Sequence, residues 1–402
     1  MTFLFPAIPC GEINAPSPVT LPEELIVQIL SLLTVQSLTR LKCVSKSWNS
    51  LISDPFFINM HLKKSSRVPH IMICLRYLST GSIINLLNPF HIHRKPSINT
   101  FTFPFDSKYD YAIIGSCNGI ICFVENFRYY REFHLLLWNP ATRFFSKTLC
   151  SFPYSEQTLN SKIEFSFGYD NVSHKYKMVA IAPRDELSVF TIGDYVWRNI
   201  QTFLTDSYHF TPMHRSRGIS CGVYVSNSLN WFALHNDINS SYFPPRNFTV
   251  DELVIISLDL GTETYTQFRL KFIQDFDEVV VVEPNICVLL ECLCFSHYSS
   301  KGYNFFVWQM KEFGVEESWM KLLKFDCYKY NLLHVYVICY GIVNFLPLHA
   351  FENGDMLIMV MERQQLILYS RRNNKIIMLD AVCDRIPWFN LNPYVESLVS
   401  IG

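Results

Sequence analysis

The chain divides into a short helical segment and a much longer strand-rich remainder. Residues 21–61, LPEELIVQILSLLTVQSLTRLKCVSKSWNSLISDPFFINMH, place Leu25, Ile29, Leu32 and Leu33 at helical spacing. Further apolar residues widen the apolar surface of this segment beyond a single stripe. Because about 40 residues bury little core alone, the segment is expected to pack against a partner surface.

Local signals divide this segment into three or four helices. Thr20 is followed three residues later by Glu23, a capping-box pattern that predicts a helix start near Leu21. Later positions carry residue types that favour the start of a further helix or a turn. They are Thr34, Ser45 and Asp54 before Pro55.

Beyond residue 70 the sequence repeats a unit of two hairpins. One hairpin of each unit has an apolar strand, a polar turn and a strand that usually opens on an aromatic residue. Its copies begin at Leu135, Val189, Val254, Phe305 and Leu366. Another strand pair precedes each copy, beginning at Gly115, Phe165, Gly222, Asn285 and Gly341. Asn118-Gly119 is a dipeptide that favours a tight hairpin turn.

Two hairpins per unit make four antiparallel strands, the content of one propeller blade. Residues 71–103 form an irregular first unit. A closed ring of such units is favoured because it covers the strand edges that an open sheet would expose. We therefore predict an α+β multidomain protein with three parts. They are a flexible leader (1–18), a helical module (19–66) and an all-β, propeller-like domain of about six four-stranded blades (70–402).

Five short motifs appear in order within residues 21–57: Leu-Pro-x-Glu-Leu, Ile-Leu, Leu-x-Val-x-Ser-Leu, Cys-Val-Ser-Lys-Ser-Trp and Asp-Pro-x-Phe. With these motifs the segment resembles an F-box. The resemblance implies docking onto a Skp-type adaptor of a cullin ubiquitin ligase. It places the contacts at Leu21, Pro22, Leu25, Ile29, Leu30, Leu33, Val35, Leu38, Val44 and Trp48. One departure is Thr34, where the family usually has proline.

Three motifs in the remainder, GSCNGIICF, LLWNPATR and FGYD, are similar to the F-box-associated interaction region of plant F-box proteins. That region is related to the kelch-repeat type, although the double-glycine signature of kelch repeats is missing here. The resemblance implies that a C-terminal strand, around residues 395–401, closes the ring.

Composition limits the partners and the compartment. Lys and Arg number 34 against 35 Asp and Glu, so no global charge favours nucleic acid or an anionic membrane. The 13 cysteines lie in apolar runs, as expected in a reducing compartment, so we predict a cytoplasmic and/or nuclear protein. The N-terminus lacks the basic region of a signal peptide, and residues 332–348 read as two buried strands instead of a membrane span.

No motif for catalysis or cofactor binding is found. Glycine-rich phosphate loops and nucleophile elbows are missing from the sequence, so no cofactor and no catalytic residue are predicted. Cys287, Cys292, Cys294 and His297 match no common zinc spacing and are interpreted as core residues, with no metal. His91 and His93 are interpreted as part of a solvated loop.

These features predict a non-catalytic receptor that recognises an unknown protein target for a Skp-cullin-F-box ubiquitin ligase. One alternative is an adaptor-binding protein that acts outside any ligase, as a decoy or a scaffold. Another is a propeller enzyme with its site in the channel. Three long inserts are candidate target contacts or merely long connections: residues 125–132, 208–217 and 235–247.

Overall fold

The structure is a computed structural model in which part of the chain is described. The described residues are 21–65, 70–75, 80–85, 98–102, 110–127, 132–146, 149–153, 163–182, 186–194, 196–200, 208–210, 222–235, 249, 252–270, 281–299, 303–330, 332, 345–360, 365–379 and 389–400. The predicted leader (1–18), the histidine pair at 91 and 93, and most of the apolar stretch 332–348 lie outside them.

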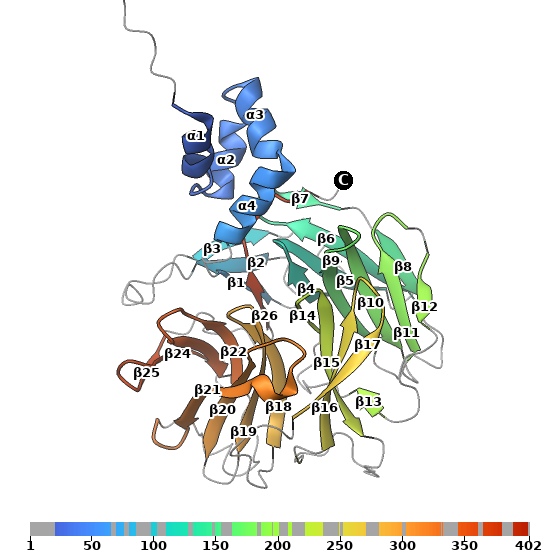
Figure 1. Ribbon diagram of the computed structural model, residues 1–402, viewed down its shortest axis with the longest axis vertical. Helices are drawn as coiled ribbons and strands as arrows, with labels where there is room; N and C mark the ends of the chain where they lie inside the picture. The colour runs from blue at the N-terminus through green and yellow to red at the C-terminus, as the bar shows by residue number, and fades with distance from the viewer. Residues whose placement is uncertain are drawn as a thin grey trace, which may run out of the picture.

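Four helices form a module at one end of the molecule (Figure 1). They are α1 (Glu23–Leu30), α2 (Val35–Leu41), α3 (Lys46–Ser53) and α4 (Pro55–Ser65). We call them the helical module. Its apolar core consists of Leu30, Val35, Leu38, Ile52 and Phe57, each at most 2% exposed.

Side chains cap three of these helices where the sequence predicts it. The oxygens of Thr34, Ser45 and Asp54 accept hydrogen bonds from main-chain N–H groups two or three residues later, at 3.3, 3.1 and 2.8 Å. The predicted capping box at the first helix is wrong. Because α1 begins at Glu23, that residue is the first of the helix instead of the third, and Pro22 precedes it without a side-chain cap.

The described strands form six antiparallel sheets, which we number as blades 1 to 6. Blade 1 contains β26 (Phe389–Tyr394), β1 (His70–Leu75), β2 (Thr80–Asn85) and β3 (Ile98–Thr102). Blade 2 contains β4 (Asp110–Cys117), β5 (Ile120–Phe127), β6 (Glu132–Asn139), β7 (Phe144–Phe145) and β8 (Cys150–Pro153). Blade 3 contains β9 (Glu164–Asp170), β10 (Lys175–Ala182), β11 (Glu186–Thr191) and β12 (Arg198–Ile200).

The other three blades follow the same order. Blade 4 contains β13 (Tyr208–Phe210), β14 (Val223–Val225), β15 (Ser228–His235), β16 (Leu253–Asp259) and β17 (Tyr265–Arg269). Blade 5 contains β18 (Val281–Leu289), β19 (Cys292–Ser299), β20 (Asn304–Met310) and β21 (Trp319–Asp326), with a 3-10 turn, η5 (Glu316–Ser318), before β21. Blade 6 contains β22 (Phe345–Ala350), β23 (Met356–Val360), β24 (Gln365–Ser370) and β25 (Lys375–Met378).

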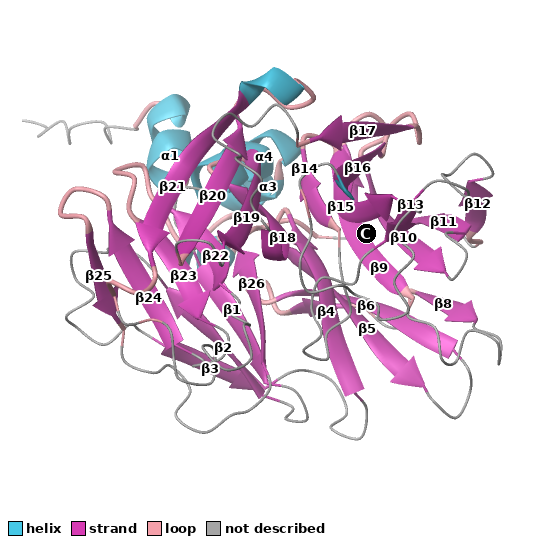
Figure 2. Cartoon of the chain, turned by 90° about the horizontal axis from the view of Figure 1, so that it is seen from below, coloured by secondary structure: helices cyan, strands magenta, loops and turns pink. Residues whose placement is uncertain are grey.

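The six sheets close into a ring. Strands β26, β4, β9, β14, β18 and β22 contact one another in this order, and β22 returns to β26. In Figure 2 strands such as β4, β18, β22 and β26 lie near the middle, whereas β12 and β25 lie at the periphery. The predicted fold, helices followed by a propeller of about six blades, is therefore confirmed. Two of the six described sheets have a fifth short strand, β8 beside β6 and β14 beside β15.

The strand that closes the ring is not the predicted one. Residues 395–400 form no strand, and the closing strand is β26, which ends at Tyr394 and pairs with β1 along its whole length. Blade 1 therefore combines the first strands of the propeller with its last.

The apolar core of the propeller lies between neighbouring blades. Phe305 of blade 5 packs against Phe345 of blade 6, with ring centroids 4.9 Å apart and ring planes inclined by 51°. Phe232 of blade 4 meets the edge of Phe295 of blade 5 at 5.5 Å. Because each blade buries its two faces against different neighbours, its strands carry apolar residues on both faces. This explains why these segments read as continuous apolar runs.

Candidate adaptor-binding surface

An exposed apolar stripe runs along α1. Leu21, Leu25, Ile29 and Leu32 are 54%, 45%, 52% and 76% exposed, although each is a large apolar side chain. Leu25 and Ile29 are four residues apart on one side of α1, and Leu21 and Leu32 lie just before and just after the helix. We call these four residues the α1 stripe.

The opposite side of α1 faces the core of the helical module. Leu30 is buried, and Ile26 and Val27 pack partly buried against the same cluster. Because α1 carries apolar side chains on both sides, its sequence has more apolar residues than a single stripe would need. One side of α1 holds the module together, and the other side is exposed.

The structure divides the ten predicted adaptor contacts into three groups. The exposed ones are Leu21, Pro22, Leu25, Ile29 and Val44. Leu33 and Trp48 are partly buried against the module core. The fully buried ones are Leu30, Val35 and Leu38. In this structure the last three support the helices from inside and present no surface. Adaptor binding by the ten residues stays a prediction.

Two exposed apolar residues were not among those ten. Leu32 belongs to the α1 stripe, and Phe56 is 75% exposed in the first turn of α4. The exposure of Phe56 could not be read from the Asp-Pro-x-Phe motif, in which the matching position is the buried Phe57.

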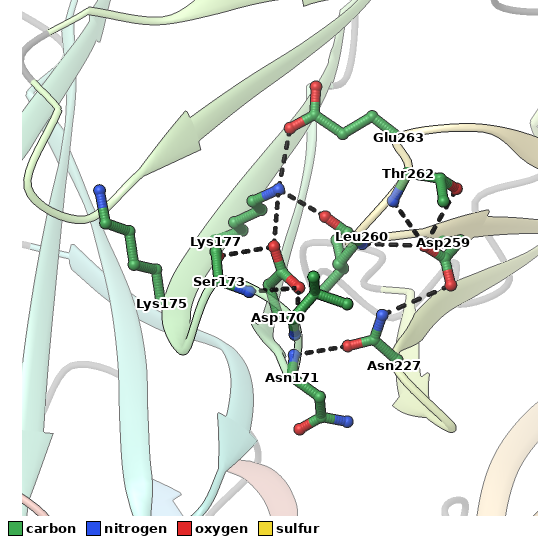
Figure 3. A network of polar contacts seen from close by, with 12 residues as sticks. Asp170, Asn171, Ser173, Lys175, Lys177, Asn227, Asp259, Leu260, Thr262 and Glu263 are labelled. Carbon is green, nitrogen blue, oxygen red and sulfur yellow. Dashed lines mark hydrogen bonds and ion pairs between the residues drawn. The ribbon is translucent and has the colours of Figure 1, made fainter.

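A network of charged residues links blade 3 to blade 4 (Figure 3). The ammonium group of Lys177 is buried, and its Nζ lies 3.1 Å from Asp170 Oδ2 and 2.9 Å from Glu263 Oε1. It also donates a hydrogen bond to the main-chain oxygen of Leu260. Arg198 holds Glu263 from the solvent side with two hydrogen bonds of 2.7 and 3.0 Å.

The pKa values of this network follow from these contacts. Burial raises the pKa of Asp170, but hydrogen bonds from Ser173, Val172 and Lys177 outweigh it, and the pKa falls to about 2. The hydrogen bonds from Arg198 lower the pKa of Glu263. Both carboxylates therefore remain ionised around the buried ammonium group, which makes the network a cross-blade clamp instead of an acid-base pair.

Main-chain turns strengthen the same contact between blades 3 and 4. Asn171 donates its main-chain N–H to Asn227 Oδ1 at 2.7 Å. Asn227 Nδ2 in turn donates to Asp259 Oδ2 at 3.4 Å, and Asp259 Oδ1 accepts from the N–H groups of the following turn. Three hairpin turns are thus joined through their side chains (Figure 3).

The cysteine and histidine residues considered for a metal do not converge. Cys287 and Cys294 face each other across β18 and β19, and burial raises the pKa of Cys287 to about 12. His297 points to the other face of β19, where its Nε2 accepts a hydrogen bond from Trp308 Nε1 at 3.2 Å. In the described ranges no three His, Cys, Asp or Glu residues are grouped as metal ligands.

Two more predictions concern surfaces and membranes. The three inserts considered as target contacts lie largely outside the described residues, which include only their strand ends at 125–127, 132, 208–210 and 235. Within the described part of the chain, no helix has the length and apolar character needed to cross a bilayer.

Comparison with known proteins agrees with this architecture. Residues 19–63 match the F-box-like family, and residues 71–401 match the family described as F-box associated beta propeller domain. An F-box/kelch-repeat protein of Arabidopsis thaliana is 27% identical over 76% of this chain and 80% of its own length. The F-box protein CPR1 of the same plant is 27% identical over 75% of this chain and 72% of its own length. The chain belongs to the family of F-box proteins that carry an F-box associated beta propeller domain.

Proposed function

We propose that this protein is the target-recognition subunit of a Skp-cullin-F-box ubiquitin ligase. The observation that carries the proposal is the α1 stripe, a row of exposed apolar side chains on a helix whose other side is buried. Removing apolar surface from water contributes about 25 cal/mol per Å², so such a row favours a protein partner. In an F-box, the Skp-type adaptor is that partner.

The proposed mechanism needs no reactive group in this chain. The helical module binds the adaptor and, through it, the cullin, while the propeller holds a protein target near the ubiquitin-charged enzyme. Holding two reactants together converts a bimolecular transfer into an effectively unimolecular one. Binding geometry is then the whole contribution of the receptor, which acts without a cofactor and without catalysis.

The same proposal places the protein in the cytoplasm or the nucleus. The cysteines whose side chains the structure describes are free thiols, including Cys287 and Cys294 in register on adjacent strands. Free, buried thiols of this kind support a reducing compartment.

Replacing Leu25 and Ile29 together with aspartate tests the adaptor contact. Each aspartate would bring an unpaired charge into an apolar interface, at a cost of several kcal/mol. We expect affinity for the Skp-type adaptor to fall by about 100-fold or more, measured by titration calorimetry with purified adaptor. Both residues are exposed, so the variant is expected to keep the helical content of the unmodified protein by circular dichroism.

The matched control adds two negative charges elsewhere on the helical module. Asn49→Asp with Asn59→Asp alters exposed residues of α3 and α4, and its adaptor affinity should stay within about threefold of the unmodified value. Equal affinity of the Leu25→Asp, Ile29→Asp variant and this control would exclude the α1 stripe as the adaptor site.

Capture from cell extract separates the ligase receptor from the decoy. The full-length protein is expected to recover both adaptor and cullin, and the Leu25→Asp, Ile29→Asp variant to recover neither. Recovery of adaptor without cullin would instead identify a protein that binds the adaptor outside a ligase.

A further inference from the structure

The six residues after the closing strand, Val395–Ser400, lie between the helical module and the propeller. They follow β26, whose last residue, Tyr394, pairs with His70 at the start of β1. The described residues after β26 thus lie at the same end of the molecule as the helices. We call these six residues the strap.

Two odd-numbered residues of the strap face the propeller. Asn139, at the end of β6, is fully buried, and its Nδ2 donates to the main-chain oxygens of Ser397 and Val399 at 3.0 and 2.9 Å. The other end of the same amide, Oδ1, accepts from the N–H of Ala141 at 3.0 Å. Val399 packs against the apolar cluster between blades 2 and 3.

The strap also touches the turn between β4 and β5. Asn118 and Gly119 form this turn with φ angles of 51° and 77°, as the sequence predicts for a tight hairpin. A Cβ atom on Gly119 would lie 2.3 Å from Ser397 Cβ and 2.7 Å from the Val395 oxygen. Only glycine leaves room for the strap at this point.

Two even-numbered residues of the strap face the helices. Leu398 is 4% exposed and belongs to the same apolar cluster as Leu30 and Phe57 of the helical module. Glu396 Oε2 accepts a hydrogen bond of 3.4 Å from the N–H of Val35, the first residue of α2. Its other oxygen, Oε1, lies 4.0 Å from His70 Nε2.

The strap thus contacts the propeller and the helices through neighbouring residues of one short segment. Residues 397 and 399 contact the propeller and Leu398 contacts the helices, whereas Glu396 lies between Val35 of α2 and His70 of blade 1. The helical module is too small to bury a large core, so one additional buried leucine is a substantial part of that core.

We propose that the strap fixes the orientation of the helical module on the propeller, and that Leu398 is the positioning residue. The consequence for ubiquitin transfer rests on the proposed function, because a fixed orientation determines which lysines reach the charged enzyme. The strap itself can be tested without adaptor, cullin or target.

The first experiment measures the orientation directly in the full chain. Spin labels on unnatural amino acids at Asn49 in α3 and Arg372 in the turn after β24, both exposed, report the distance between the two bodies. We expect one narrow distance distribution in the unmodified protein. Leu398→Asp, or a stop after Tyr394, should broaden it, whereas Ser400→Ala at an exposed residue should leave it unchanged.

Hydrogen exchange shows whether residues 395–400 stabilise the helical module alone or the propeller as well. In the chain that stops after Tyr394, amides of α1 and α2 are expected to exchange at least about 30-fold faster, because their core has lost Leu398. The strands of blade 1 should exchange at their usual rate, since β26 is retained. An unchanged distance distribution, or equal loss of protection in helices and blades, would overturn the proposal.

A further readout tests positioning in transfer. In a ligase reconstituted from purified adaptor and cullin, mass spectrometry maps which of the receptor's own lysines receive ubiquitin. Leu398→Ala is expected to change that pattern at saturating adaptor, and Leu398→Met, which keeps the buried volume, to restore it. An unchanged pattern with Leu398→Ala would exclude the positioning role. If the protein does not bind the adaptor, the proposed function is wrong. The distance and hydrogen-exchange measurements still test whether the strap orients the helical module.

Discussion

Deletion of residues 389–402 is expected to open the ring and to prevent the propeller from folding as a cooperative unit. The deletion removes β26, which pairs with all six residues of β1 from His70 to Leu75. It also removes the strand that lies between β22 of blade 6 and β4 of blade 2. The buried residues Met72 and Ile113 would lose their neighbour Tyr394, and exposed edges and apolar faces of this kind favour aggregation.

A stop after Tyr394 is the matched control, because it keeps β26 and removes only the residues that follow. We expect this shorter chain to elute as a monomer from size exclusion and to unfold in one transition by circular dichroism. The chain that ends at residue 388 should instead elute in the void volume or lack a cooperative transition. A stable, monomeric 1–388 chain would show that blade 1 does not depend on its C-terminal strand.

Asp170→Asn is expected to destabilise the protein by about 3 kcal/mol, because it removes one ionic partner of a buried ammonium group. Lys177 would keep its other ionic partner, Glu263, at 2.9 Å. The loss of unfolding free energy should therefore not exceed about 3 kcal/mol. Asparagine preserves the Oδ1 acceptor for the N–H groups of Val172 and Ser173, so the change is confined to Oδ2, which faces Lys177 and the Ser173 hydroxyl. The measurement is the urea midpoint at neutral pH.

The pH dependence of this variant gives a second check. The pKa of Asp170 is about 2 in the folded protein against an ordinary value of 3.8. The stabilising effect of its charge is therefore complete above about pH 4 and is lost as the pH falls toward 2. The difference in stability between the unmodified protein and Asp170→Asn should shrink by about 2 kcal/mol over that interval.

Asp194→Asn provides the surface control for the charge change. Asp194 lies 3.7 Å from Lys175, and both side chains are more than 40% exposed. An exposed pair of this kind contributes at most about 1 kcal/mol, so this variant should unfold close to the unmodified midpoint at every pH. Equal losses for Asp170→Asn and Asp194→Asn would show that Lys177 does not depend on Asp170.

Local signals predicted the elements of this fold well. The caps at Thr34, Ser45 and Asp54 depend only on neighbouring residues, and the sequence identified the first two as caps and the third as a turn or a helix start. The ten hairpins were found from apolar runs and polar turns for the same reason. Their repetition led to the propeller, because four antiparallel strands per unit leave few other closed arrangements.

Contacts between distant parts of the chain were not predictable. The sequence of an apolar helix face does not show whether that face packs inside its own module or is exposed. The buried Leu30, Val35 and Leu38 therefore could not be distinguished from the exposed Leu25. Asn139 and Asp170 lie in the motifs LLWNPATR and FGYD, which was the one available signal for their importance. Asn139 contacts Ser397, 258 residues away, and Lys177, which binds Asp170 from the adjacent strand, also contacts Glu263, 86 residues away.

The place of Leu398 in the core of the helices has a consequence for the order of synthesis. The helices are synthesised before the propeller, and the residue that completes their core follows the last propeller strand, β26. A chain released early therefore lacks both the last strand of blade 1 and the leucine beneath α1. The core of the N-terminal helices can therefore be completed only after all six blades have been synthesised.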